Sequence, residues 1–126
     1  MRLMAALAIA GTITVQANAS DLSQHIAKIN PSLDKATVAA VARELRLYPP
    51  VMTYIARRES SFDPKAHSRG CVGLTGVNLK IWHKHLTDEG VIKGSQDLWT
   101  IKGNLKAGWY VYKKCKKSYR RYRGIR

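Results

Sequence analysis

Apolar residues recur at helical spacing in the first half of the chain, and prolines interrupt the pattern. Two such runs are divided by the turn formers at 30–32, and the second run has Ser32 or Asp34 near its start as a candidate cap. The second run should end before Pro49 and Pro50, because a residue that precedes a proline avoids the helical region. A proline is tolerated in the first turn of a helix, so a third helix can run from about Pro50 to Glu59.

The second half of the chain continues the helical pattern after an irregular segment. Residues 63–76 are rich in turn formers and predict a loop, and residues 78–86 predict a fourth helix. Asp97 is expected to cap one last, long helix that runs toward the end of the chain. Its apolar stripe comprises Ile101, Leu105, Gly108, Tyr112, Cys115, Tyr119 and Tyr122. We find no run typical of β-strands, so the predicted fold class is all-α.

Length and charge limit the organisation and the partners. A chain of 126 residues with 45% hydrophobic residues predicts one globular domain and argues against disorder. The formal net charge of +14 favours an anionic partner, such as nucleic acid, a membrane surface or an acidic wall polymer. Residues 102–126 are rich in Lys and Arg and contain no acid. This basic helix could bind nucleic acid or an anionic envelope polymer or lipid, or it could be a solvated helix face.

The first residues resemble a secretion signal. A short basic start is followed by an apolar stretch from Leu3 to Val15 and by Ala17-Asn18-Ala19, which has small residues at the positions that a signal peptidase requires. We therefore expect residues 1–19 to be a signal peptide, residues 20–126 to be the mature domain, and the protein to be exported to the periplasm or the cell exterior. A buried N-terminal helix and an uncleaved anchor are the alternatives.

Cysteines and histidines give little indication of a metal site. Cys71 and Cys115 are the only cysteines, and they could form one disulfide in an oxidising compartment or remain separate thiols. His83 and His85 are two residues apart, which does not place them on one helix face. We predict no metal site and no cofactor.

The third predicted helix carries the candidate chemistry. Met52, Ile55, Ala56 and Glu59 fall on one face of it, so the carboxyl group of Glu59 continues an apolar stripe. Loss of hydration there favours the protonated form of a carboxyl group, which a general acid requires. The alternative is a structural carboxylate paired with a basic neighbour.

The segment that follows Glu59 resembles the catalytic segment of the soluble lytic transglycosylases. The family pattern begins Glu-Ser-x-Phe-x-Pro-x-Ala-x-Ser and continues into a glycine-rich segment that closes on Gly-Leu-x-Gln. The residues of this chain that match the family are Glu59, Ser60, Phe62, Pro64, Ala66, Ser68, Gly70, Gly73 and Leu74. Two positions differ, since Cys71 replaces the usual Ala and Gly76 stands where the family has Gln.

This resemblance implies a lysozyme-like, all-α domain of the goose-type lysozyme kind that acts as a monomer on peptidoglycan glycan strands. In the family, one glutamic acid, here Glu59, protonates the leaving oxygen of the MurNAc-β-1,4-GlcNAc bond and then deprotonates the C6 hydroxyl of the muramic acid, which leaves a 1,6-anhydro end. Small members occur in phages and in secretion or conjugation machines. The resemblance implies the following substrate-binding residues, with the last in place of the missing Gln: Ser60, Ser68, Gly73, Leu74 and Asn78.

The resemblance weakens toward the C-terminus. Asn104 to Gly108 matches the family element Asn-Ile-x-x-Gly loosely, and the final signature Ala-Tyr-Asn-Ala-Gly, whose Tyr holds the catalytic acid, is absent. We expect either that Tyr119 or Tyr122 takes this role or that the domain is incomplete at its C-terminal end. Two other functions stay open. One is a hydrolysing muramidase, and the other is a non-catalytic basic protein that binds the wall or nucleic acid.

Overall fold

The computed structural model describes residues 33–125 of the chain. The predicted signal peptide (1–19), its cleavage site and the first predicted helix lie outside the described residues. The elements in order are α2 (Lys35–Glu44), α3 (Pro49–Ser60), β1 (His67–Ser68), β2 (Cys71–Val72), β3 (Val77–Asn78), α4 (Leu79–Asp88), the 3-10 helix η2 (Ser95–Trp99), α5 (Ile101–Lys114) and α6 (Tyr119–Ile125).

The helix starts follow from the capping residues and prolines in the sequence. The Asp34 side chain accepts a hydrogen bond from the Thr37 backbone N–H at 2.8 Å, so α2 begins where the sequence predicts. Pro49 and Pro50 occupy the first turn of α3, where a missing N–H costs nothing. Asn78 caps α4 by accepting from the backbone N–H of Ile81 at 3.1 Å. The predicted helices in this part of the chain are confirmed to within a few residues.

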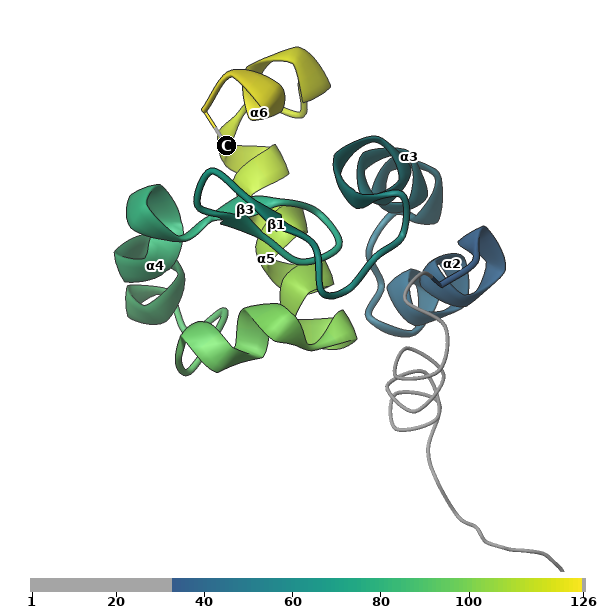
Figure 1. Ribbon diagram of the computed structural model, residues 1–126, viewed down its shortest axis with the longest axis horizontal. Coiled ribbons are helices and arrows are strands. Elements are labelled where there is room, and N and C mark those ends of the chain that lie inside the picture. The colour runs from purple at the N-terminus through teal and green to yellow at the C-terminus, as the bar shows by residue number, and fades with distance from the viewer. Residues whose placement is uncertain (1–32, 126) are drawn as a thin grey trace, which may run out of the picture.

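Helix α5 lies in the middle of the domain. It contacts α2, α3, α4 and α6, and in Figure 1 α2 and α3 lie on one side of it while α4 lies on the other. One core cluster joins α2 and α3 to the first half of α5 through residues such as Val41 and Met52. A second cluster joins the sheet, α4 and α6 to the second half of α5 through residues such as Trp82, Val111 and Tyr122. These clusters hold α3 and α6 in fixed positions relative to the loop between β2 and β3.

The domain is mostly helical, but it contains a small sheet that the all-α prediction missed. The strand order is β1-β2-β3, and both pairs are antiparallel, with Ser68 opposite Cys71 and Val72 opposite Val77. Each strand has two residues, which is too short to show an alternation of apolar and polar positions. Arg69 and Gly70 form the first turn with φ of 53° and 83°, as a tight hairpin requires.

The predicted long C-terminal helix is in fact two helices. Helix α5 ends at Lys114, and Lys116 and Lys117 adopt left-handed backbone conformations with φ of 57° and 56°. Ser118 then starts α6, since its hydroxyl accepts from the Arg121 backbone N–H at 3.3 Å. The break re-orients the chain, and α6 packs back over the end of α5 (Figure 1). The prediction of one helix was wrong because its apolar stripe keeps helical spacing across the break.

The start of α5 also differs from the prediction. Asp97 lies in η2, and its carboxylate accepts from the Lys93 backbone N–H at 2.7 Å. Thr100 is the cap, because its hydroxyl accepts from the Gly103 backbone N–H at 3.0 Å and donates to the Asp97 carbonyl at 2.7 Å. The backbone of Asp97 fills the space beside Gly103, since a Cβ there would lie 2.1 Å from its carbonyl oxygen. The absence of a side chain at Gly103 therefore lets the backbone of Asp97 approach α5 closely.

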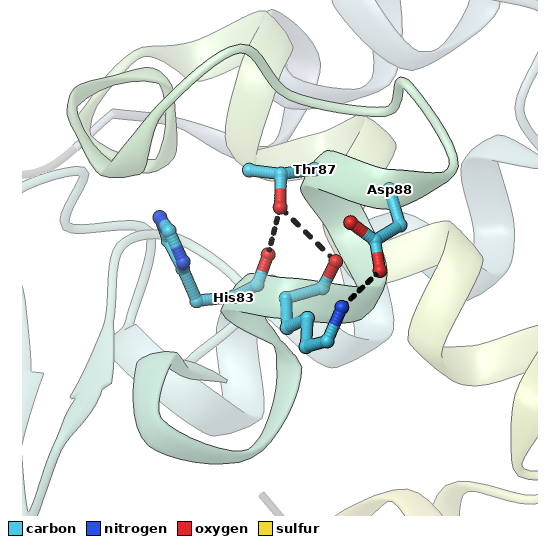
Figure 2. A network of polar contacts seen from close by, with 4 residues as sticks. His83, Thr87 and Asp88 are labelled. Carbon is cyan, nitrogen blue, oxygen red and sulfur yellow. Dashed lines mark hydrogen bonds and ion pairs between the residues drawn. The ribbon is translucent and has the colours of Figure 1, made fainter.

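Removal of this cap should have a measurable cost. We expect Thr100→Ala to lower the free energy of unfolding by about 1 kcal/mol, because the Gly103 N–H loses its partner. Chemical denaturation followed by circular dichroism measures the difference. Thr87→Ala is the matched control, because the Thr87 hydroxyl only donates to the carbonyls of His83 and Lys84 within α4 (Figure 2). An equal loss in both variants would contradict the assignment of Thr100 as the cap.

The outer face of α4 carries exposed polar side chains. Lys84 and Asp88 form an ion pair at 2.7 Å, which contributes little because both side chains are well exposed (Figure 2). Among residues 33–125, no group of three or more His, Cys, Asp or Glu side chains is placed to hold a metal ion. No helix within the same residues combines the length and the apolar character that a membrane span needs.

Candidate functional site

Glu59 lies at the C-terminal end of α3 beside a small pocket. Its side chain is half-buried, while Met52, Ile55 and Ala56 on the same face of α3 are fully buried in the core. The pocket has a volume of about 60 Å³ and is lined by Glu59, Ala66, His67, Ser68, Cys71, Gly73 and Gly76. Glu59 is the only carboxylate among these lining residues.

Tyr119 of α6 holds the carboxyl group of Glu59. The Tyr119 hydroxyl donates a short hydrogen bond to Glu59 Oε2. Burial raises the pKa of Tyr119, and the hydrogen bond to Glu59 raises it further, while Arg123 and Arg58 act in the opposite direction. The phenol therefore stays protonated at neutral pH and is available as a donor. Of the two tyrosines considered from the sequence, Tyr119 is the one that contacts the candidate acid.

Aromatic neighbours fix the position of the Tyr119 ring. The Tyr54 ring of α3 packs edge-on against it with a centroid distance of 5.2 Å, and the Tyr122 ring stacks on it at 6.2 Å. Tyr122 is fully buried, and its hydroxyl donates to the Thr75 carbonyl oxygen at 2.5 Å. Burial raises the pKa of Tyr122 as well, so this phenol also remains a donor. The two tyrosines of α6 thus tie this helix to both α3 and the loop.

Gly76, where the family has Gln, lies directly against Glu59. A Cβ atom at this position would lie 3.2 Å from Glu59 Oε1 and 3.3 Å from Glu59 Cβ. The backbone of Gly76 has a φ of +64°, which side chains with a Cβ rarely adopt. Glycine therefore lets the loop close over the acid without pressing on it, which gives a structural reason for this departure from the family pattern.

Asn104 of α5 positions the loop that carries Gly73 and Gly76. The side chain is buried, and its Oδ1 accepts from the backbone N–H and the hydroxyl of Thr75 at 2.8 and 2.6 Å. Its Nδ2 donates to the carbonyls of Val72 and Leu98, both at 2.9 Å. A Cβ at Gly73 would lie 2.0 Å from Asn104 Nδ2, so the glycine makes room for this amide.

Sequence reasoning did not identify Asn104 as a site residue, although a signal was present. The segment Asn104-Leu105-x-x-Gly108 matches the family element, and it contains both residues of α5 that contact Thr75 in the loop. Gly108 packs against Thr75, since a Cβ at Gly108 would lie 2.4 Å from Thr75 Oγ1. The close neighbour of Gly108 is therefore a side chain, that of Thr75.

Ser60 links α3 to the same loop. Its hydroxyl lies 2.7 Å from the Leu74 carbonyl oxygen and 2.9 Å from the Ala56 carbonyl oxygen, and it accepts from the Asp63 backbone N–H at 3.2 Å. All three partners of the Ser60 hydroxyl are therefore backbone groups of the protein. Ser60 is not among the residues that line the pocket beside Glu59. Its geometry therefore supports a role in holding the loop.

The other predicted substrate-binding residues divide into two groups. Ser68 and Gly73 line the pocket together with Glu59. Leu74 is fully buried in the core around α2 and α3, and its carbonyl oxygen accepts from the Ser60 hydroxyl at 2.7 Å, so its position favours a structural role over the predicted contact with a substrate. Asn78 caps α4 and lies outside the residues that line the pocket, so its side-chain amide does not replace the missing Gln there.

Of the two alternatives left open for the cysteines, the structure has separate thiols. Cys71 on β2 and Cys115 at the end of α5 are both buried and free. Burial raises the pKa of the Cys115 thiol, so it is less reactive than an exposed cysteine. Each residue acts as a small apolar side chain in the packed interior.

The arrangement places one carboxyl group, oriented by a phenol, at the edge of a small pocket. The protonated carboxyl group can donate a proton to an atom of a bound ligand, and the carboxylate that results can then accept a proton. Asp63 is the next carboxyl group along the chain after Glu59, and it accepts from the Lys65 backbone N–H at 2.9 Å, as a turn residue does. No family model, no curated protein and no solved structure matches this chain.

Proposed function

We propose that this chain is an exported peptidoglycan lytic transglycosylase with a lysozyme-like helical fold and with Glu59 as its acid and base. One observation carries the proposal. The carboxyl group of Glu59 lies beside a pocket and is held there by the hydroxyl of Tyr119, a residue from a different helix. A carboxylate with a merely structural role on the helix end would not need a pocket, a glycine against its oxygen and a phenol to orient it.

The proposed reaction uses Glu59 twice. The protonated carboxyl group donates its proton to the glycosidic oxygen as the bond from that oxygen to C1 of the muramic acid breaks. The carboxylate then takes the proton of the C6 hydroxyl, whose oxygen forms the new bond to C1. Atoms balance without water, and the attacking hydroxyl is already attached to the substrate, which favours the step entropically.

The composition of the pocket favours this reaction over hydrolysis. Most glycoside hydrolases use two carboxyl groups that flank the bond, one as acid and one as base or nucleophile. Glu59 is the only carboxylate that lines the pocket, and Asp63 is engaged in a turn. An acid–base pair is therefore not assembled at this pocket, whereas a single acid suffices for intramolecular attack.

The ends of the released fragments test the proposal. The full chain is incubated with purified peptidoglycan, and the soluble fragments are separated and weighed by mass spectrometry. We expect 1,6-anhydro ends, which are lighter by one water than the reducing ends that a muramidase leaves. Fragments with reducing ends would support the hydrolase, and binding without release would support a non-catalytic wall protein.

Tyr119 is proposed as a positioning residue, and its hydroxyl can be removed alone. We expect Tyr119→Phe to lower kcat by about 10- to 100-fold with little change in KM, because a small misplacement of the acid affects the reaction more than binding. Tyr112→Phe is the matched control. Tyr112 is half-buried against the same core cluster, and its hydroxyl makes no hydrogen bond within residues 33–125. Equal kcat values for the two variants would contradict the role of Tyr119.

A further inference from the structure

A larger pocket between α2 and α3 is lined by positively charged residues. It has a volume of about 450 Å³, compared with about 60 Å³ for the pocket beside Glu59. Lys35, Arg43 and Arg57 line it, and no acid does. Within residues 33–125, none of these three side chains forms an ion pair. We call this pocket the α2–α3 groove. Its charge is complementary to an anionic ligand.

Part of the groove lining is apolar and poor in hydrogen-bond donors. Ala39, Pro49 and Pro50 belong to this part, and prolines have no N–H. The Thr53 hydroxyl lies 2.9 Å from the Pro49 carbonyl oxygen, to which it donates. A uniformly charged ligand, such as a polyphosphate, would find partners only in the cationic residues of the lining. A ligand that alternates methyl groups with carboxylates would match both the apolar and the cationic residues.

Two tyrosines connect the groove to the candidate active site. Tyr54 lines the groove, and its ring packs against the ring of Tyr119, which holds Glu59. The Arg57 guanidinium lies 5.9 Å from the centroid of the Tyr54 ring, which places this charge where groove and tyrosine pair meet. The groove and the candidate acid are therefore linked through the contact between the rings of Tyr54 and Tyr119.

We propose that the α2–α3 groove binds the peptide stems of peptidoglycan, so that the substrate is a glycan strand that still carries its peptides. These stems combine alanine methyl groups with free carboxylates, which match the apolar and the cationic residues of the lining. The proposal rests on the proposed function and deepens it by naming the substrate class. Exposed ion pairs contribute little one at a time, so the apolar residues and the three cations act together.

The test compares glycan strands that carry peptides with the same strands after enzymatic removal of the peptides. We expect the full chain to have a KM about tenfold lower for the peptide-bearing strands, and the double variant Lys35→Gln/Arg43→Gln to lose this difference. Lys80→Gln/Lys93→Gln removes the same charge from two exposed residues outside the groove and should keep the difference. Equal KM values for both strands, or equal effects of both double variants, would overturn the proposal.

A binding measurement separates failure of this inference from failure of the proposed function. The free stem peptide is titrated by calorimetry into the full chain and into both double variants, which requires no cleavage. Binding that the groove variant loses and the control keeps supports the groove even if no strand is cut. Absence of binding, or displacement of the peptide by inorganic polyphosphate at equal concentration, overturns it in favour of an empty or general anion site.

Discussion

Replacement of Glu59 by Gln should reduce the rate of glycan cleavage by at least about 10³-fold, with binding to peptidoglycan retained. The amide has nearly the same shape as the carboxyl group, and its oxygen can still accept the hydrogen bond from the Tyr119 hydroxyl. It cannot donate an acidic proton to the leaving oxygen or accept one from the C6 hydroxyl. Release of soluble fragments measures cleavage, and sedimentation with insoluble peptidoglycan measures binding.

A control for this variant is available on the surface. Glu89 is an exposed residue at the end of α4, so Glu89→Gln makes the same change in charge outside the pocket and should leave the rate unchanged. If the Glu59→Gln variant cleared peptidoglycan at the wild-type rate, Glu59 would not be the acid. Any lysis of cells by the protein would then have to come from its positive charge acting on membranes.

The second large effect concerns stability. We expect Asn104→Ala to lower the free energy of unfolding by about 3 to 5 kcal/mol, because several buried groups lose their hydrogen-bond partner at once. These groups are the Thr75 N–H and the carbonyls of Val72 and Leu98. A loss of this size is a large part of the stability of a small domain, so the loop over Glu59 should lose its order as well.

Guanidinium denaturation measures this loss. Lys106→Ala on the same helix is the control, because Lys106 is exposed and Ala has a slightly higher helix propensity. A loss below about 1 kcal/mol for Asn104→Ala would contradict the view that this amide holds the loop. Recovery of most of the stability by Asn104→Asp would contradict it too, because a carboxylate cannot donate to the Val72 and Leu98 carbonyls.

The helices and their buried faces could be predicted from the sequence because their signals are local. Asp34 as a cap, the prolines before α3 and the stripe of Met52, Ile55 and Ala56 are all features of neighbouring residues. The same stripe indicated that Glu59 lies at the edge of the core. The position of Glu59 in the fold thus follows from periodicity, while its proposed chemistry depends on the resemblance around it.

The contacts that define the site could not be predicted, because they are long-range. The break at Lys116 and Lys117 has no glycine or proline to mark it, and only Ser118, a frequent cap residue, signals a new helix. Without that break, Tyr119 would continue along α5 and would not reach Glu59. The closeness of Gly76 to the acid and the four hydrogen bonds of Asn104 likewise depend on tertiary packing.

The fate of solvent oxygen tests the central claim most directly. The full chain is incubated with purified peptidoglycan in water enriched in a heavy oxygen isotope, and the released fragments are weighed. If Glu59 directs the C6 hydroxyl to C1, the released fragments should contain no heavy oxygen from the water. The Glu59→Gln variant should release no fragments. Heavy oxygen at the new ends would contradict the intramolecular reaction, and the absence of fragments from the wild-type chain would contradict the enzymatic function as a whole.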